Sequence, residues 1–119
     1  MRACRYFPAG NRSNAGIRGE WGEFKTYREY MDAVNNELVI LPMIETNEAM
    51  ENLDAIASVP GVDVLLIGSN DLCAEMGIPG DFGNDRLAEA YATMIAACEK
   101  SNKFPGMAGI YNEAIMPRY

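Results

Sequence analysis

The most constraining feature of the sequence is a short apolar run that ends on a carboxylate. Residues 38–44 are almost uninterrupted by polar side chains, and Glu45 follows them directly. The run is too short and too uniformly apolar for a surface helix, so it predicts a strand that is buried on both faces. An unpaired charge at the end of a buried strand is unfavourable, and Glu45 is therefore expected to have a specific partner.

Two further apolar runs follow, and helical patterns separate them. Residues 62–67 and 103–110 are predicted as the second and third strands. Thr26 and Thr46 are placed to begin two of the helices, and Asn84 or Asp85 begins a longer one. Regular alternation of strand and helix indicates an α/β fold in which parallel strands are joined by right-handed crossovers.

Length, composition and charge limit the class of protein. The chain has 119 residues, of which 49% are hydrophobic, so one folded domain over residues 1–119 is expected. The formal net charge is −7, which argues against a nucleic-acid partner. No run reaches the ~20 apolar residues that span a bilayer, and no signal peptide is recognisable, so the expected location is the cytoplasm.

Two acidic residues occupy the positions where chemistry is usual in parallel sheets. Glu45 comes directly after the first predicted strand, and Asp71 lies in the turn after the second. The carboxyl ends of neighbouring parallel strands meet at one edge, so the two carboxylates are expected to converge. Without histidine or cysteine nearby, such oxygen ligands suit Mg²⁺ or Mn²⁺. The alternative is structural, with Glu45 favoured by a helix dipole and Asp71 capping a short helix.

The stretches PMIETNEAMENLDAIASVPGVDVLLIGSNDLCAEMGIPG and RYFPAGNRS together resemble a known family. The combination of an Ile-Glu-Thr-x-Glu-Ala segment with a later Ile-Gly-x-x-Asp-Leu segment is similar to the HpcH/HpaI aldolases, which are metal-dependent and grouped with citrate lyases. The resemblance implies a partial (β/α)8 TIM barrel, with about three parallel β/α units that match strands 5 to 7 of the family.

The resemblance also implies residue roles. Glu45 and Asp71 match the two metal ligands of the family, and the backbone N–H groups of Gly68, Ser69, Asn70 and Asp71 match those that hold the carboxylate of a pyruvate-like 2-oxo acid. The implied activity is that of a carbon–carbon lyase, an aldolase that works through a pyruvate enolate. Most relatives carry Pro-Ala where this chain has Ser69 and Asn70.

Other departures from the family are larger. A complete barrel has eight strands in about 250 residues, and the family's substrate-orienting arginine and catalytic histidine come from strands that have no counterpart here. The chain contains no histidine, and none of Arg5, Arg12 and Arg18 replaces the strand arginine by position.

Two main hypotheses follow from these departures. The first is a lyase that a second copy or a separate chain completes. The second is an inactive, truncated relative that binds a divalent metal, a 2-oxo acid or another subunit. A doubly wound nucleotide-binding domain is a weaker third alternative, because no G-x-G-x-x-G motif follows a strand.

Overall fold

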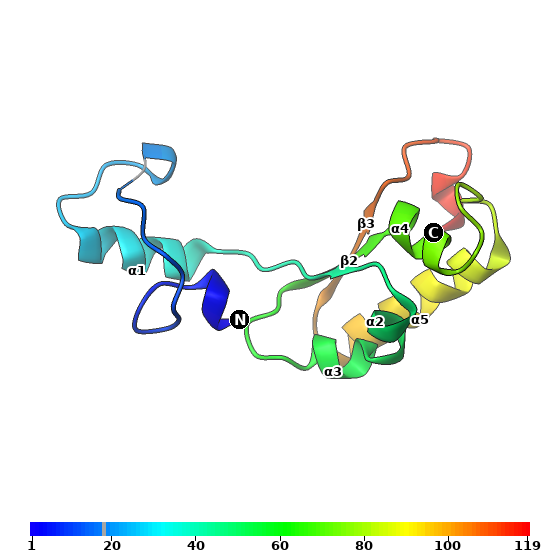
Figure 1. Ribbon diagram of the computed structural model, residues 1–119, viewed down its shortest axis with the longest axis horizontal. Helices are drawn as coiled ribbons and strands as arrows, with labels where there is room; N and C mark the ends of the chain where they lie inside the picture. Colours follow the sequence, from blue (N-terminus) through cyan, green and yellow to red (C-terminus); the bar gives the residue numbers. More distant parts are fainter. Residues whose placement is uncertain (18) are drawn as a thin grey trace. The chain divides into compact units, whose positions relative to one another are not determined.

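The computed structural model describes residues 1–17 and 19–119. Arg18, one of the three arginines compared above with the family's strand arginine, lies outside the described residues. The chain divides into two compact units, Met1–Ile40 and Leu41–Tyr119, and each is described by itself. Figure 1 shows the elements of both. The expectation of one domain over residues 1–119 stays a prediction.

The first unit contains one α-helix and two short 3-10 segments. The 3-10 segments are η1 (Arg2–Cys4) and η2 (Gly19–Trp21), and the helix is α1 (Tyr27–Glu37). The predicted cap is confirmed, because the Thr26 hydroxyl accepts a hydrogen bond from the Glu29 N–H at 3.2 Å. The Glu29 carboxylate reaches back to the N–H of Lys25 at 3.1 Å, which completes a variant of the capping box.

A small core holds the first unit together. Asn35 in α1 accepts a hydrogen bond from the Tyr6 N–H at 2.7 Å and donates one to the Tyr6 carbonyl at 3.1 Å. Arg5 donates to the Asn35 carbonyl, and the Arg12 guanidinium lies 5.0 Å from the centre of the Tyr6 ring. The buried apolar members of this core are Tyr6, Tyr30 and Val34. Both arginines therefore make contacts within their own unit.

The second unit is built on a three-stranded parallel sheet in the order β1-β2-β3. The strands are β1 (Met43–Ile44), β2 (Val64–Gly68) and β3 (Phe104–Ala108). Ile44 pairs with Ile67, and Gly68 pairs with Ala108. The predicted α/β class and the parallel arrangement are confirmed.

Helices connect the strands of the second unit. They are α2 (Asn47–Glu51), α3 (Leu53–Ala57), α4 (Ser69–Glu75) and α5 (Asp85–Ser101). Thr46 caps α2 as predicted, and Asn84, not Asp85, caps α5. The single helix expected after Thr46 is divided at Asn52, and the last described element is the 3-10 segment η3 (Met116–Arg118).

The sheet is buried on one face only, which corrects the prediction that its strands are buried on both faces. Ile44, Leu65 and Ile67 are at most 1% exposed and belong to the main core, which α3 and α5 complete. In Figure 1, α5 runs beside β2 and β3. On the opposite face Leu41 is 47% exposed, Met43 46% and Phe104 72%. Successive side chains of a strand point to opposite faces of the sheet, and the single layer of helices covers only one of these faces.

The first predicted strand is also shorter than expected, since residues 38–42 are not in β1. The Pro42 carbonyl still accepts a hydrogen bond from the Leu66 N–H at 3.1 Å, so pairing with β2 begins just before β1. Among the described helices, none is long and apolar enough to cross a bilayer.

Candidate functional site

The strand register brings Glu45 against Gly68. Ile44 pairs with Ile67, so the next residue on each strand, Glu45 and Gly68, lie side by side at the carboxyl end of the sheet. A Cβ atom added to Gly68 would lie 2.7 Å from Glu45 Oε1 and 2.8 Å from Glu45 Cγ. Any larger residue at position 68 would therefore force the Glu45 side chain to move away from the backbone of β2.

A cavity of about 190 Å³ lies at this end of the sheet. All the residues that the sequence analysis predicted as metal ligands or substrate-binding residues line this cavity. The lining residues are Met43, Glu45, Gly68, Ser69, Asn70, Asp71, Ala108, Gly109 and Tyr111. The structure therefore brings the predicted site residues together, and their roles as ligands are taken up below as proposals.

The two carboxylates have no protein partner in the part of the chain that the structure describes. Over residues 1–17 and 19–119, neither Glu45 nor Asp71 forms a side-chain hydrogen bond or an ion pair. Asp71 is in the first turn of α4, whose N-cap is Gly68 and which has no side-chain cap, so Asp71 does not act as the N-cap. A favourable interaction of either carboxylate with a helix dipole stays open as the structural alternative.

The donor set fits a hard divalent cation. No group of three or more His, Cys, Asp or Glu side chains that could hold a metal occurs among the described residues, so the protein would supply two carboxylates. Mg²⁺ is often bound by one or two carboxylates, with water or substrate oxygens in the other positions. Mn²⁺ accepts similar oxygen ligands.

Ser69 faces the core with its side chain. Its hydroxyl is fully buried and donates a hydrogen bond to the Ala108 carbonyl at 2.7 Å. The hydroxyl of Tyr91 in α5 lies 2.8 Å away and is then the donor to Ser69, because the single serine proton is already used. Burial raises the pKa of Tyr91, so its phenol is held in the protonated form that this bond needs. Only the backbone of Ser69 is therefore available to a ligand.

Sequence reasoning missed the contribution of the third strand to the cavity. Ala108, Gly109 and Tyr111 come from the end of β3 or just after it. The rule that selected Glu45 and Asp71, namely that parallel strands present chemistry at their carboxyl ends, would also have selected this segment. A Cβ atom added to Gly109 would lie 2.7 Å from Asn70 Nδ2, so the segment after β3 passes close to Asn70.

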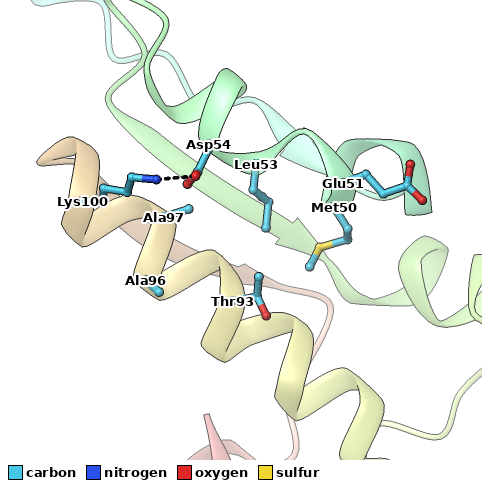
Figure 2. Close-up of a pocket in the computed structure, with 8 residues that line it drawn as sticks. All are labelled: Met50, Glu51, Leu53, Asp54, Thr93, Ala96, Ala97 and Lys100. Carbon is cyan, nitrogen blue, oxygen red and sulfur yellow. Dashed lines mark hydrogen bonds and ion pairs between the residues drawn. The ribbon is translucent and has the colours of Figure 1, made fainter.

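A larger cavity of about 430 Å³ lies in the helical layer. Figure 2 shows that α2, α3 and α5 contribute its side chains, and that Lys100 is paired with Asp54. Since Lys100 already has Asp54 as its partner and the other lining residues are mostly small or apolar, this cavity offers little for catalysis. Its lining residues are Met50, Glu51, Leu53, Asp54, Thr93, Ala96, Ala97 and Lys100.

Comparison with known proteins identifies the family. The family model described as HpcH/HpaI aldolase/citrate lyase matches residues 1–112. The chain belongs to this family. It is 41% identical over 113 residues to a 4-hydroxy-4-methyl-2-oxoglutarate aldolase of Hapsidospora irregularis. This match covers 92% of this chain and 41% of the relative. It is 36% identical over 119 residues to a 4-hydroxy-2-oxo-heptane-1,7-dioate aldolase of Escherichia coli, which covers 100% of this chain and 45% of the relative.

Solved structures of HpcH/HpaI proteins agree with this assignment. An HpcH/HpaI aldolase of Desulfitobacterium hafniense matches with a TM-score of 0.81 and 28% identity over 98% of this chain and 45% of its own. A Burkholderia cenocepacia protein of the HpcH/HpaI aldolase/citrate lyase family matches with a TM-score of 0.75 and 28% identity, over 89% of this chain and 42% of its own. The predicted partial TIM barrel is confirmed, and the chain spans less than half the length of the relatives it matches.

The buried Ser69 contacts generate a stability prediction. Ser69→Ala is expected to destabilise the fold by about 1–3 kcal/mol, because the Tyr91 hydroxyl and the Ala108 carbonyl lose a buried partner. Tyr91→Phe should cost a similar amount, and the double variant should cost less than the sum because both changes remove one shared bond. Urea unfolding measures all three.

A matched control is available on the surface. Ser58 is exposed and donates one hydrogen bond to the Ala55 carbonyl at 2.9 Å. Ser58→Ala is expected to change the unfolding free energy by no more than about 0.5 kcal/mol. If Ser69→Ala and Ser58→Ala had equal effects, the hydroxyl of Ser69 would have no special structural role.

Proposed function

We propose that this chain forms the metal-binding part of a carbon–carbon lyase, an aldolase that acts on 2-oxo acids. The observation that carries the proposal is the pair Glu45 and Asp71, which line one cavity at the carboxyl end of a parallel sheet and have no partner among the described residues. Membership of the HpcH/HpaI family and the names of the relatives support the reaction class.

In this proposal Glu45 and Asp71 hold a divalent cation, Mg²⁺ or Mn²⁺. When bound, the cation supplies a Lewis acid that stabilises the enolate of a 2-oxo acid. Gly68 serves the site through its missing side chain, because any Cβ would displace the Glu45 carboxylate. The contact between these two residues thus makes the position of one ligand depend on the backbone of the next strand.

The substrate carboxylate is proposed to lie against the backbone of Gly68, Ser69, Asn70 and Asp71. The first N–H groups of a helix have no acceptor within the helix and are free to bind an anion. In this chain Ser69, Asn70 and Asp71 form the first turn of α4, and the Ser69 side chain holds that turn to the end of β3. The match to the family's pyruvate-binding turn supports this placement.

Proton transfer is the weak part of the chemistry. The chain has no histidine, and general acid–base help is commonly worth ~10²–10⁴ in rate. This observation favours the second candidate function, a truncated relative that binds the metal and the 2-oxo acid without catalysing aldol cleavage. The two candidates share the same metal site and differ in whether aldol cleavage occurs once a second copy or a separate chain completes the site.

The metal site is tested by titrating Mn²⁺ into the wild type and two variants. Glu45→Gln is expected to lower Mn²⁺ affinity at least tenfold. Mutating a residue that only hydrogen-bonds to a metal ligand already lowers metal affinity by about tenfold or more, and Glu45 would be a ligand itself. Glu48→Gln is the matched control, because Glu48 is exposed on α2 and does not line the cavity. Equal affinity in the wild type and Glu45→Gln would exclude the site.

The reaction class is tested with two substrates in the presence of Mn²⁺. Release of carbon dioxide from oxaloacetate is expected, because this decarboxylation needs no protein base, whereas deuterium uptake into pyruvate and aldol cleavage should be slow without histidine. Asp71→Asn should lower the release of carbon dioxide. Rapid deuterium uptake by the wild type alone would show that the missing histidine is not needed.

The exposed face of the sheet indicates a partner, either a second copy or a chain that completes the barrel. Leu41, Met43 and Phe104 are each at least 46% exposed. β1 and β3 are the edges of the sheet and present backbone groups to solvent. Apolar surfaces of this kind are unusual on monomers and tend to be covered.

Self-association of the isolated chain at micromolar concentration is therefore expected, and sedimentation velocity measures it. Phe104→Lys should shift the chain towards the monomer, because it places a charge on the apolar face. Ala92→Lys adds the same charge on the exposed side of α5 and should leave association unchanged. A stable monomer in the wild type would contradict the prediction.

A further inference from the structure

Asn70 is the residue of the cavity whose chemistry the proposed function does not use. Its side chain is exposed and lines the cavity beside Glu45 and Asp71. The carboxamide lies over Gly109, where an added Cβ would come 2.7 Å from Nδ2 and 3.6 Å from Cγ. The absent side chain of Gly109, whose φ is +91°, leaves the space that this carboxamide occupies.

The backbone that carries Asn70 is held in place by its neighbour. Ser69 is fully buried and binds both the Ala108 carbonyl and the Tyr91 hydroxyl. Asn70 is thus anchored to the end of β3 on the buried side through Ser69, and its own side chain contacts Gly109 on the cavity side. Anchoring of this kind lowers the entropy lost when a side chain binds a ligand.

The Asn70 carboxamide has donors to offer. Within residues 1–17 and 19–119, its side chain makes no hydrogen bond. It is also the only side chain with N–H groups among the described residues that line the cavity. The other polar side chains there are the carboxylates of Glu45 and Asp71 and the hydroxyls of Ser69 and Tyr111, of which the Ser69 hydroxyl is already bonded.

The charge of the cavity determines which ligand these donors suit. Glu45 and Asp71 make it acidic, so a carboxylate ligand needs N–H donors as well as a cation. A lysine or arginine would pair with the acidic residues and compete with the cation, whereas a neutral amide does not. Asn70 can therefore donate to an anionic oxygen without weakening the metal site.

We propose that the Asn70 carboxamide is a ligand-binding contact, which donates a hydrogen bond to a carboxylate oxygen of the bound 2-oxo acid. The inference rests on the proposed function of the cavity. It adds a side-chain donor to the backbone groups considered above, at a position where the family pattern has alanine. Ser69 is then the positioning residue that holds Asn70 at the cavity.

The test is calorimetric titration of pyruvate into the whole chain with Mn²⁺ bound. Asn70→Ala is expected to weaken pyruvate binding about tenfold, the usual effect of losing a hydrogen bond to a charged group. Its Mn²⁺ affinity should equal that of the wild type, because Asn70 does not hold the cation. Asn36→Ala is the matched control, since Asn36 is exposed in α1, outside the cavity, and should change neither affinity.

A second variant separates hydrogen bonding from shape. Asn70→Asp keeps the size of the side chain but replaces its N–H donors by a charged acceptor, so pyruvate should bind more weakly than to Asn70→Ala, with no loss of Mn²⁺ affinity. Pyruvate binding to Asn70→Ala as tight as to the wild type would overturn the inference and leave the proposed function standing. Wild-type binding of pyruvate that is absent or independent of Mn²⁺ would overturn both.

Discussion

The parallel pairing of β1, β2 and β3 is the constraint on which the rest of the second unit depends. Because Ile44 pairs with Ile67 and Gly68 with Ala108, the carboxyl ends of the three strands lie at the same end of the sheet. The residues that follow the strands surround one small cavity there. A shift of the register by one residue would turn Glu45 to the helical face and Ile44 to the exposed face. Core packing and the candidate site therefore depend on the same pairing.

The buried hydroxyl of Ser69 connects that core to the site. It joins the turn after β2 to the end of β3 and to α5. Because the side chain of Ser69 is fully buried and makes both hydrogen bonds, the turn that carries the candidate site is tied to the core.

The exposed face of the sheet and the candidate site share one origin. Met43 and Leu66 lie on the face away from the helices, as do Glu45 and Gly68 at its carboxyl end. In a closed barrel this face points inward and is filled by side chains of the other strands. Met43 and Glu45 are two residues apart and so lie on the same face of the sheet. This chain spans less than half the length of its relatives, and on this face Glu45 reaches the cavity while Met43 is exposed.

The sequence by itself determined the order of the strands and main helices, the helix caps at Thr26 and Thr46, and the identity of Glu45 and Asp71 as the acidic pair, because periodicity, caps and the carboxyl-end rule are local or topological. It also determined the family. Only the tertiary structure decided that Met43 is exposed while Ile44 is buried, because a uniformly apolar run does not reveal which of its faces another layer covers. The register that sets Glu45 against Gly68, the burial of Ser69 and the contact of Asn70 with Gly109 also came from tertiary structure, since each joins residues on different strands or helices.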